Sequence, residues 1–234
     1  MNSFDYSIIS FFNQFAQRSQ QFDSFVILVS NNVLIKGGFI VALFWYAWYQ
    51  EDIPKIVKRN REHILTTIFA SLISIIGIRI LVLSLPFRPR PLHHPEIALQ
   101  FPLKENVLEG WSSFPSDHAM LFFTLATSLF FVSHVLGKIA IAHAIFVISL
   151  PRIYLGLHYP TDILAGALIG IGVSLWFNRR KISGTITKLP MRLLDKHPSL
   201  FYSCFFIVIF ETAEMFSSLR QIASMMFSTL SSFF

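Results

Sequence analysis

Long apolar runs separated by short polar stretches dominate the chain, and their lengths carry the first prediction. Most runs approach the about 20 residues that an α-helix needs to cross a bilayer. The last run is interrupted by Glu211 and Glu214 and is the weakest candidate. We therefore predict an all-α, polytopic transmembrane bundle of about six membrane helices. The predicted spans are residues 25–49, 64–85, 115–133, 139–157, 162–177 and 200–216.

The first 22 residues follow a different pattern from the predicted spans. Phenylalanine and isoleucine recur there at mixed three- and four-residue spacing among polar side chains. This pattern favours an amphipathic helix that lies in the membrane interface over one that crosses the bilayer.

Composition supports a membrane protein and excludes several other classes. The sequence is 53% hydrophobic and only 14% charged, whereas soluble proteins carry about 25% charged residues. The single cysteine, Cys204, excludes an internal disulfide framework and a multi-cysteine metal site. The net charge of +6 comes largely from basic residues beside apolar runs. That placement favours a topology signal and contact with anionic membrane lipids, and argues against a nucleic acid partner.

Two basic stretches orient the predicted spans. Residues 51–63 and 179–196 are rich in lysine and arginine, so the positive-inside rule puts both in the cytoplasm. The connections at the other ends of the spans then lie outside. Three polar motifs consequently share the outer face: RPRP at 88–91, FPSDH at 114–118 and PRIYLGLHYPTD at 151–162.

The third motif suggests nucleophilic chemistry on a phosphate group. His158 precedes Asp162 by four residues, which is one turn if the backbone is helical. A carboxylate in that position fixes the imidazole tautomer and leaves the other nitrogen free to attack or to transfer a proton. Arg152 adds a planar donor fork suited to phosphate.

The other two motifs extend this inventory. His118 permits a division of labour in which one histidine is the nucleophile and the other a general acid. Ser116 could donate to phosphate oxygens at a helix start. Acidic residues are sparse, so we expect no metal and no other cofactor. The polar candidates of the outer face are Arg79, Arg88, Arg90, Ser116, His118, Arg152, His158 and Asp162.

Together the three motifs resemble the signature of the type 2 phosphatidic acid phosphatase family of membrane lipid phosphatases. That signature reads Lys-x6-Arg-Pro, then Pro-Ser-Gly-His, then Ser-Arg-x5-His-x3-Asp. The resemblance implies that His158 is the nucleophile, that Asp162 orients it and that His118 protonates the leaving oxygen. The implied phosphate ligands are Arg88, Ser116 and Arg152.

Three positions depart from the family signature. Asp117 stands in place of the glycine, and Pro151 stands in place of the serine before the arginine. The lysine of the first motif is missing, and the nearest basic residue is Arg79, nine positions before Arg88. An intramembrane arginine is costly, so we interpret Arg79 as a phosphate ligand in place of that lysine, with snorkelling to the headgroups as the alternative.

The resemblance implies a bacterial membrane enzyme that dephosphorylates a lipid phosphate or diphosphate at the outer face, most like the undecaprenyl-diphosphate phosphatases. We expect one integral membrane domain over residues 1–234, with a core at 24–178 and a basic loop and hydrophobic segment at 179–234. The expected location is the inner membrane, with the site facing the periplasm and with lipid phosphate and membrane lipids as partners. The alternatives are a lipid phosphotransferase and a non-catalytic transporter of an anionic lipid.

Overall fold

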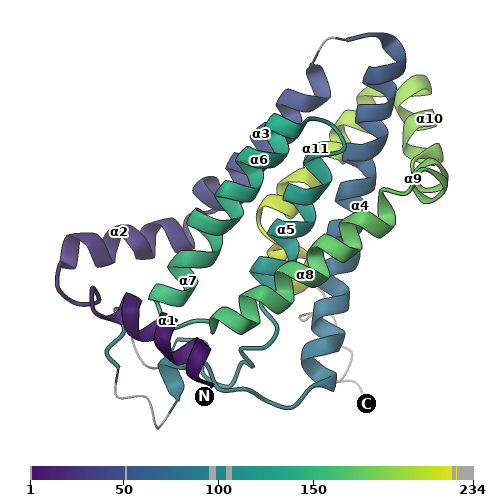
Figure 1. Ribbon diagram of the computed structural model, residues 1–234. Coiled ribbons are helices and arrows are strands. Elements are labelled where there is room, and N and C mark those ends of the chain that lie inside the picture. Colours follow the sequence, from purple (N-terminus) through teal and green to yellow (C-terminus); the bar gives the residue numbers. More distant parts are fainter. Residues whose placement is uncertain (1, 51, 95–98, 104–106, 223–224, 226–234) are drawn as a thin grey trace.

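The computed structural model describes residues 2–50, 52–94, 99–103, 107–222 and 225, and these fold as an all-α bundle (Figure 1). Within these ranges every regular element is helical. The helices are α1 Ser3–Asn13, α2 Gln20–Asn31, η1 Leu34–Gly38, α3 Phe39–Tyr49, α4 Pro54–Ser84, η2 Pro91–His93, α5 Asp117–Leu129, α6 His134–His143, η3 Ala144–Ser149, α7 Leu150–Tyr154, α8 Pro160–Phe177, α9 Arg180–Ile186, α10 Lys188–Lys196 and α11 Pro198–Ala213.

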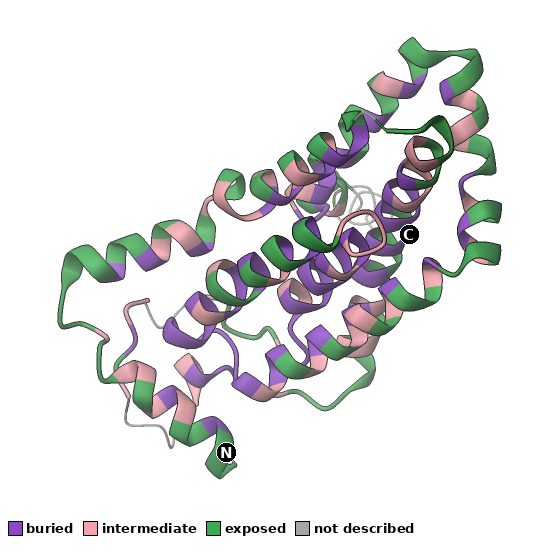
Figure 2. Ribbon diagram, turned by 45° about the horizontal axis from the view of Figure 1, so that its top comes forward, coloured by how far each residue is buried: buried purple, intermediate pink, exposed green. Residues whose placement is uncertain are grey.

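Helix α5 forms the centre of the bundle and packs against α4, α6 and α8. Ser116 caps its start through a side-chain oxygen that accepts the amide of Ala119, and almost every side chain that follows is buried (Figure 2). Polar pairs tie the helix to its neighbours: Ser128 Oγ lies 2.7 Å from Ser174 Oγ on α8. Such pairs satisfy polar groups that lipid cannot solvate.

Small residues let α8 approach α5 closely enough to fix the geometry between them. A Cβ atom added at Gly166 would lie 2.4 Å from the carbonyl oxygen of Ser116, and one at Gly170 would lie 2.2 Å from that of Met120. Backbone contact of this kind requires glycine at both positions. The close approach places the start of α8, which carries Asp162, directly beside the start of α5, which carries His118.

The helices confirm an integral membrane protein, although they differ in length from the predicted spans. Among the described residues, three helices are long and apolar enough to cross a membrane: α4, the continuous unit α6–η3–α7, and α8. A fourth span results if α2 and η1–α3 are counted as one. The prediction of about six membrane helices therefore depends on α5 and α11, which have only 13 and 16 residues.

The first predicted span, residues 25–49, is not a single helix. Its two halves, Gln20–Asn31 and Leu34–Tyr49, are bent by 62° relative to each other. Asn32 ends the first half, and its side chain accepts the amide of Ile35 at the start of the π-helical segment η1. The segment lies against α11, where a Cβ on Gly37 would overlap the backbone of Ala213. The bend places Ser30 and Lys36 next to the polar end of the bundle.

Both basic stretches are more helical than predicted. The basic stretch at 51–63, which precedes the predicted span 64–85, largely belongs to α4, which begins at Pro54 and continues without a break to Ser84. Proline is favoured in the first turn of a helix, and the lysines and arginines that follow it are good helix formers. The expected loop at 179–196 contains α9 and α10.

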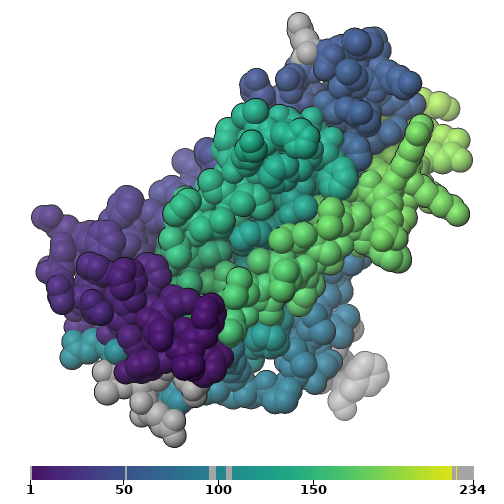
Figure 3. Space-filling view, in the orientation of Figure 1, coloured from purple at the N-terminus to yellow at the C-terminus, as the bar shows by residue number. Residues whose placement is uncertain are grey.

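The predicted amphipathic helix at the N-terminus is shorter than its pattern, because α1 ends at Asn13. It lies against α7 and the start of α8 (Figure 3). The two buried residues of α1 are Asp5 and Ile9, one turn apart. The buried face of this helix thus carries a carboxylate into the polar end of the bundle.

Candidate active site

A cavity of about 280 Å³ opens at the polar end of the bundle, where the three sequence motifs meet. His118, Arg152 and His158 line it together, as predicted from the sidedness of the spans. Among the charged residues of the described lining, cations outnumber the single carboxylate, that of Asp117. The lining cations are Lys36, Arg79, Arg90, Arg152 and Arg220.

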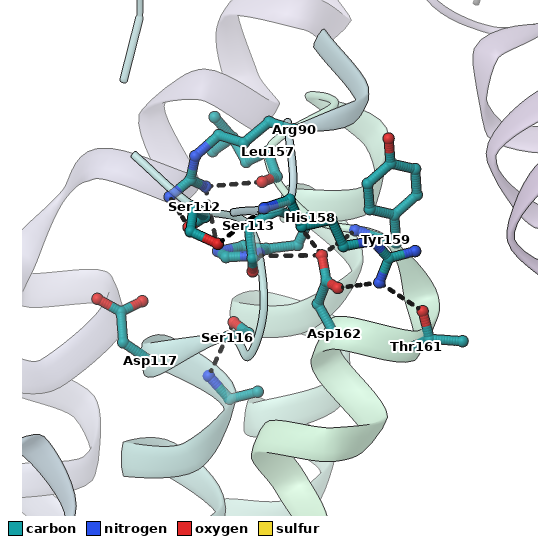
Figure 4. Close-up of polar contacts among 12 residues, drawn as sticks. Arg90, Ser112, Ser113, Ser116, Asp117, Leu157, His158, Tyr159, Thr161 and Asp162 are labelled. Carbon is teal, nitrogen blue, oxygen red and sulfur yellow. Dashed lines mark hydrogen bonds and ion pairs between the residues drawn. The ribbon is translucent and has the colours of Figure 1, made fainter. Parts of the chain in front are cut away.

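Arg90 is the arginine of the RPRP motif that faces this cavity. Its side chain is only 7% exposed and is held by backbone carbonyls, with Nη1 donating to Leu157 O at 2.7 Å and Nε to Trp111 O at 3.3 Å (Figure 4). Nη1 also lies 3.3 Å from Nε2 of His158. Arg90 therefore presents a fixed positive charge beside that imidazole.

Arg88, predicted as a phosphate ligand, lies elsewhere. It is absent from the described residues that line the cavity. Its Nη1 bonds to the carboxylate of Asp162 and its Nη2 lies 2.8 Å from Oδ2 of Asp5. The guanidinium also lies 4.0 Å from the ring centre of Tyr159. Two carboxylates and an aromatic ring thus surround Arg88 outside the cavity lining, where it holds Asp162 in place. Arg90 is the arginine of the motif that lines the cavity.

The turn between α7 and α8 positions the third motif. Gly156 adopts φ = +70°, which is favourable only for glycine, and the chain reverses there. The amides of Leu157 and His158 then bond back to the carbonyl of Arg152 at 2.9 and 3.3 Å. Arg152 itself donates from Nη1 to Ile148 O at 2.8 Å. The turn thus holds Arg152 and His158 on the same wall of the cavity.

The contacts of His158 fix its tautomer. Nδ1 lies 2.9 Å from the carbonyl oxygen of Ser113 and 3.7 Å from Oδ2 of Asp162. A carbonyl only accepts and an arginine only donates. Nδ1 must therefore carry the proton, and Nε2 presents its lone pair toward Arg90 and the cavity. The carbonyl of Ser113 makes the contact that the sequence prediction had assigned to Asp162.

His158 lies in the turn between two membrane-spanning helices, and its burial keeps the imidazole neutral. Desolvation lowers the pKa of His158 below its ordinary value of 6.5, and the positive charge of Arg90 acts in the same direction. The contact with Asp162 opposes this shift without cancelling it. At neutral pH the side chain is therefore the unprotonated base that nucleophilic attack requires.

Asp162 organises the groups around His158. Its Oδ2 accepts the amide of Tyr159 at 2.8 Å and the hydroxyl of Ser113, and its Oδ1 receives Arg88. Through Ser113, whose carbonyl bonds to Nδ1, Asp162 fixes the orientation of the imidazole indirectly as well as by its own proximity (Figure 4). A carboxylate at the third position of α8 also stabilises the helix start.

Ser116, predicted as a phosphate ligand, is fully buried and acts as the cap of α5. Its amide donates to the carbonyl of Asp162 at 3.1 Å, which ties the second motif to the third. The neighbouring residues Pro115 and Asp117 line the cavity, whereas the side chain of Ser116 does not appear among the described lining groups. In the structure Ser116 therefore positions the start of α5.

Asp117, which replaces the family glycine, connects two predicted site residues. Its Oδ1 lies 2.8 Å from Nδ1 of His118, and its Oδ2 lies 3.7 Å from Nη2 of Arg79. The guanidinium of Arg79 also lies 5.1 Å from the ring centre of Trp111. Because the carboxylate is an acceptor, Nδ1 of His118 carries the proton, and its other nitrogen remains available for the cavity.

With this geometry established, comparison with known proteins identifies the family. A model of the PAP2 superfamily matches residues 62–181, more than half of the chain. The chain belongs to the PAP2 superfamily. The matched region holds most of α4 and all of α5, α6–η3–α7 and α8, and thus His118, Arg152 and His158. Lys36 and Arg220 reach the cavity from segments outside the match.

Individual relatives are similar over different lengths. The bacitracin transport permease protein BcrC of Bacillus licheniformis is 42% identical over 60 residues, which are 26% of this chain and 29% of that protein. The undecaprenyl-diphosphatase of Sulfolobus acidocaldarius is 34% identical over 82 residues, 35% of this chain and 39% of its own. The lipid A 1-diphosphate synthase of Escherichia coli is 27% identical over 179 residues, 73% of each chain. No solved structure matches this chain.

Asp5, Ser113 and Arg220 are parts of this PAP2 site that were not assigned from the sequence. Asp5 is fully buried and accepts both the amide and the hydroxyl of Thr161, at 2.9 and 2.7 Å, in addition to Arg88. A carboxylate on the same helical face as Ile9 was the available signal for Asp5. The main-chain role of Ser113 and the approach of Arg220 had no comparable signal, since both depend on tertiary contacts.

Metal ligands do not cluster anywhere in the part of the chain that the structure describes: no group of three or more histidine, cysteine or acidic side chains could hold an ion there. Among the charged groups of the described lining, five cations face the single carboxylate of Asp117, and this excess of positive charge repels a divalent metal and attracts an oxyanion. The arrangement therefore suits the binding of phosphate oxygens by guanidinium groups next to a neutral, oriented imidazole.

Proposed function

We propose that this protein is a membrane lipid phosphatase that works through a phosphohistidine at His158. The observation that carries the proposal is the environment of that residue. Its Nδ1–H is held by the carbonyl of Ser113, and its Nε2 faces a cavity lined by Arg90 and Arg152. A buried, neutral imidazole beside two guanidinium groups is the pairing that attack on a bound phosphoryl group requires.

The proposed reaction has two steps. In the first, Nε2 of His158 attacks phosphorus while Arg90 and Arg152 hold the non-bridging oxygens. The phosphorus–oxygen bond to the lipid breaks, and the leaving oxygen takes a proton from Nε2 of His118, which enters this step protonated on both nitrogens and leaves it neutral. In the second, water attacks the phosphohistidine, His118 accepts the proton of that water, and free phosphate and neutral His158 result. Asp117 stabilises the protonated form of His118 through its 2.8 Å contact.

The substrate we rank first is undecaprenyl diphosphate, followed by phosphatidic acid and phosphatidylglycerol phosphate. The similarity to an undecaprenyl-diphosphatase supports this order, although the alignment covers only 39% of that protein. The chain spans less than half the length of the first relatives that it matches. The lipid is therefore a proposal that rests mainly on the chemistry of the cavity.

Phosphate release tests the proposed function directly. Detergent-solubilised, purified protein is expected to release inorganic phosphate from a polyisoprenyl diphosphate in the presence of a chelator and without added metal. The arginines supply the positive charge that a metal supplies in other phosphatases. Loss of activity on chelation, with recovery on adding Mg²⁺, would contradict the metal-independent reaction. Absence of phosphate release under all these conditions would contradict the hydrolase.

A lipid phosphotransferase is the second candidate, and the similarity to a lipid A 1-diphosphate synthase over 73% of each chain supports it. In a phosphotransferase a lipid oxygen replaces water in the second step, and His158 serves both reactions equally. Radiolabelled diphosphate supplied with an acceptor lipid distinguishes them: a labelled lipid product indicates transfer, and free phosphate indicates hydrolysis. A transporter of anionic lipid would give neither product.

We further propose that the site faces the periplasm from a bacterial inner membrane, because the basic stretches at 51–63 and 179–196 favour the cytoplasm. Cysteine labelling of intact cells tests this orientation after the exposed native Cys204 is replaced by serine. Glu109→Cys, in the exposed loop near the cavity, is expected to react with an impermeant thiol reagent. Lys58→Cys and Lys181→Cys, also exposed, are expected to react only after the cells are opened. The reverse pattern would place the site in the cytoplasm.

A further inference from the structure

The catalytic cavity borders a second, larger hollow of about 960 Å³ whose walls are mainly apolar. Leu83, Leu85 and Phe87, at the end of α4 and just beyond it, line only this hollow, which we call the apolar groove. Two cations belong to both spaces, Arg79 from α4 and Arg220 from the segment after α11. The two guanidinium groups therefore lie at the junction between a polar cavity and an apolar groove.

Arg220 reaches this junction because the chain breaks sharply after α11. Met215 and Phe216 have φ values of +58° and +57°, a left-handed conformation that is strained for residues other than glycine. The two glutamates that had no predicted role support the break. Leu219 N donates to Oε2 of Glu211 at 3.2 Å, and Ser218 Oγ donates to Oε2 of Glu214 at 3.0 Å. Such strain persists only where the surrounding structure requires it.

The charge of Arg220 has little compensation among the described residues. Its Nε donates to the carbonyl of Phe216 at 3.3 Å, and no carboxylate of the described chain lies within ion-pair distance of its guanidinium. Burial and the nearby charge of Arg79 lower the pKa of Arg220 below its ordinary value. An arginine stays charged under these conditions. Asp117 pairs with Arg79 at 3.7 Å and makes no ion pair with Arg220, so the two cations of the junction exceed the carboxylate charge paired with them.

The two junction cations lie on the leaving-group side of the site. Arg90 is 3.3 Å from Nε2 of His158 and so belongs with the phosphoryl group under attack. Arg79 instead contacts Asp117, the residue that holds His118. In the proposed reaction His118 delivers a proton to the departing oxygen. An anion at the junction would therefore be attached to that oxygen.

We propose that Arg79 and Arg220 form a second phosphate subsite, which binds the lipid-side phosphate of a polyisoprenyl diphosphate while its chain lies in the apolar groove. The inference rests on the proposed phosphatase function and specifies its substrate class. A lipid monophosphate has no group for this subsite, because its only phosphate occupies the position beside His158. The junction cations thereby make the enzyme selective for diphosphates.

Substitution of Arg220 tests the subsite by substrate selectivity. Arg220→Gln is expected to lower kcat/KM for a polyisoprenyl diphosphate by about 10- to 100-fold, the usual effect of losing a charge-assisted hydrogen bond. The same variant is expected to lose clearly less activity on the matched monophosphate, and an unchanged thermal unfolding temperature shows that it folds. Arg220→Lys, which keeps the charge, is expected to recover part of the diphosphate activity.

Lys36→Gln provides the matched comparison. Lys36 lines the catalytic cavity but not the apolar groove, so its loss is expected to lower the rates on both substrates by a similar factor. An Arg220→Gln variant that behaves in the same way, with equal losses on both substrates, would overturn the second subsite while leaving the phosphatase intact. Absence of phosphate release from either substrate by the wild-type protein would instead overturn the proposed function.

Chain length tests the groove separately. Leu83 is 87% exposed and lines the apolar groove but not the catalytic cavity. Leu83→Trp is therefore expected to fill the groove without disturbing the core. The wild-type protein is expected to prefer a long-chain polyisoprenyl diphosphate over a five-carbon one, and the variant is expected to lose most of this preference. An unchanged preference in Leu83→Trp would show that the chain lies elsewhere.

Discussion

His158→Ala is expected to abolish phosphate release, with a residual rate at least about 10⁴-fold below wild type, because the proposed phosphohistidine cannot form without the imidazole. Folding is expected to survive, since the imidazole makes two polar contacts, to Ser113 and Arg90, that water can replace in the enlarged cavity. The measurement is single-turnover phosphate release together with the thermal unfolding temperature of the purified variant.

His134→Ala is the matched control for this experiment. His134 is an exposed histidine at the start of α6, just after the end of α5 that is opposite to the cavity. It is not among the described cavity residues. Its removal is expected to leave the rate within about 2-fold of wild type, as is usual for surface substitutions. Phosphatase activity in His158→Ala close to that of His134→Ala would exclude His158 as the nucleophile.

The contacts of His158 also predict the behaviour of Asp162→Asn. In serine proteases the equivalent change costs about 10⁴-fold in kcat, because the wrong imidazole tautomer forms. Here the carbonyl of Ser113 holds Nδ1–H at 2.9 Å independently of the carboxylate. The tautomer is therefore retained in Asp162→Asn, and the loss of rate is expected to be smaller than 10⁴-fold. A loss as large as that of His158→Ala would show that Asp162 has a more direct role.

The architecture was largely predictable because bilayer-length apolar runs constrain the chain strongly. Hydropathy located α4, α6–η3–α7 and α8, although α4 begins ten residues before its predicted span. Hydropathy could not predict the bend between Gln20–Asn31 and Leu34–Tyr49, since both halves are apolar. The bend depends on local capping by Asn32 and on the packing of Gly37 against α11, which are specific contacts and not average composition.

The site was predictable to the extent that its residues share one local turn. Arg152 and His158 are joined by backbone hydrogen bonds across Gly156. Their separation in the sequence therefore predicts that they are close in space. The RPRP motif carries no such information. Whether Arg88 or Arg90 faces the cavity depends on partners far away in the chain, Asp5 for the former and the carbonyl of Leu157 for the latter.

The second large effect is expected from His118, and it depends on the substrate. A lipid alkoxide is a poor leaving group, so losing a positioned acid costs about 10²–10⁴-fold in rate. A lipid monophosphate that leaves from a diphosphate is a much weaker base, with a second ionisation near about pH 6 by analogy with phosphorylated side chains. His118→Ala is therefore expected to reduce hydrolysis of a lipid monophosphate far more than hydrolysis of the matching diphosphate.

The measurement is kcat/KM for matched isoprenyl mono- and diphosphates with both enzymes, compared as differences in barrier height. Equal losses on the two substrates would mean that His118 binds phosphate and does not deliver a proton. If His118 delivers the proton, His118→Ala and Arg220→Gln are expected to change the diphosphate preference in opposite directions. The first raises the preference and the second lowers it. Asp117 holds Nδ1 of His118 and also contacts Arg79, so it influences both the proton donor and the proposed second phosphate subsite. Asp117→Asn is accordingly expected to reduce both rates without changing the preference strongly.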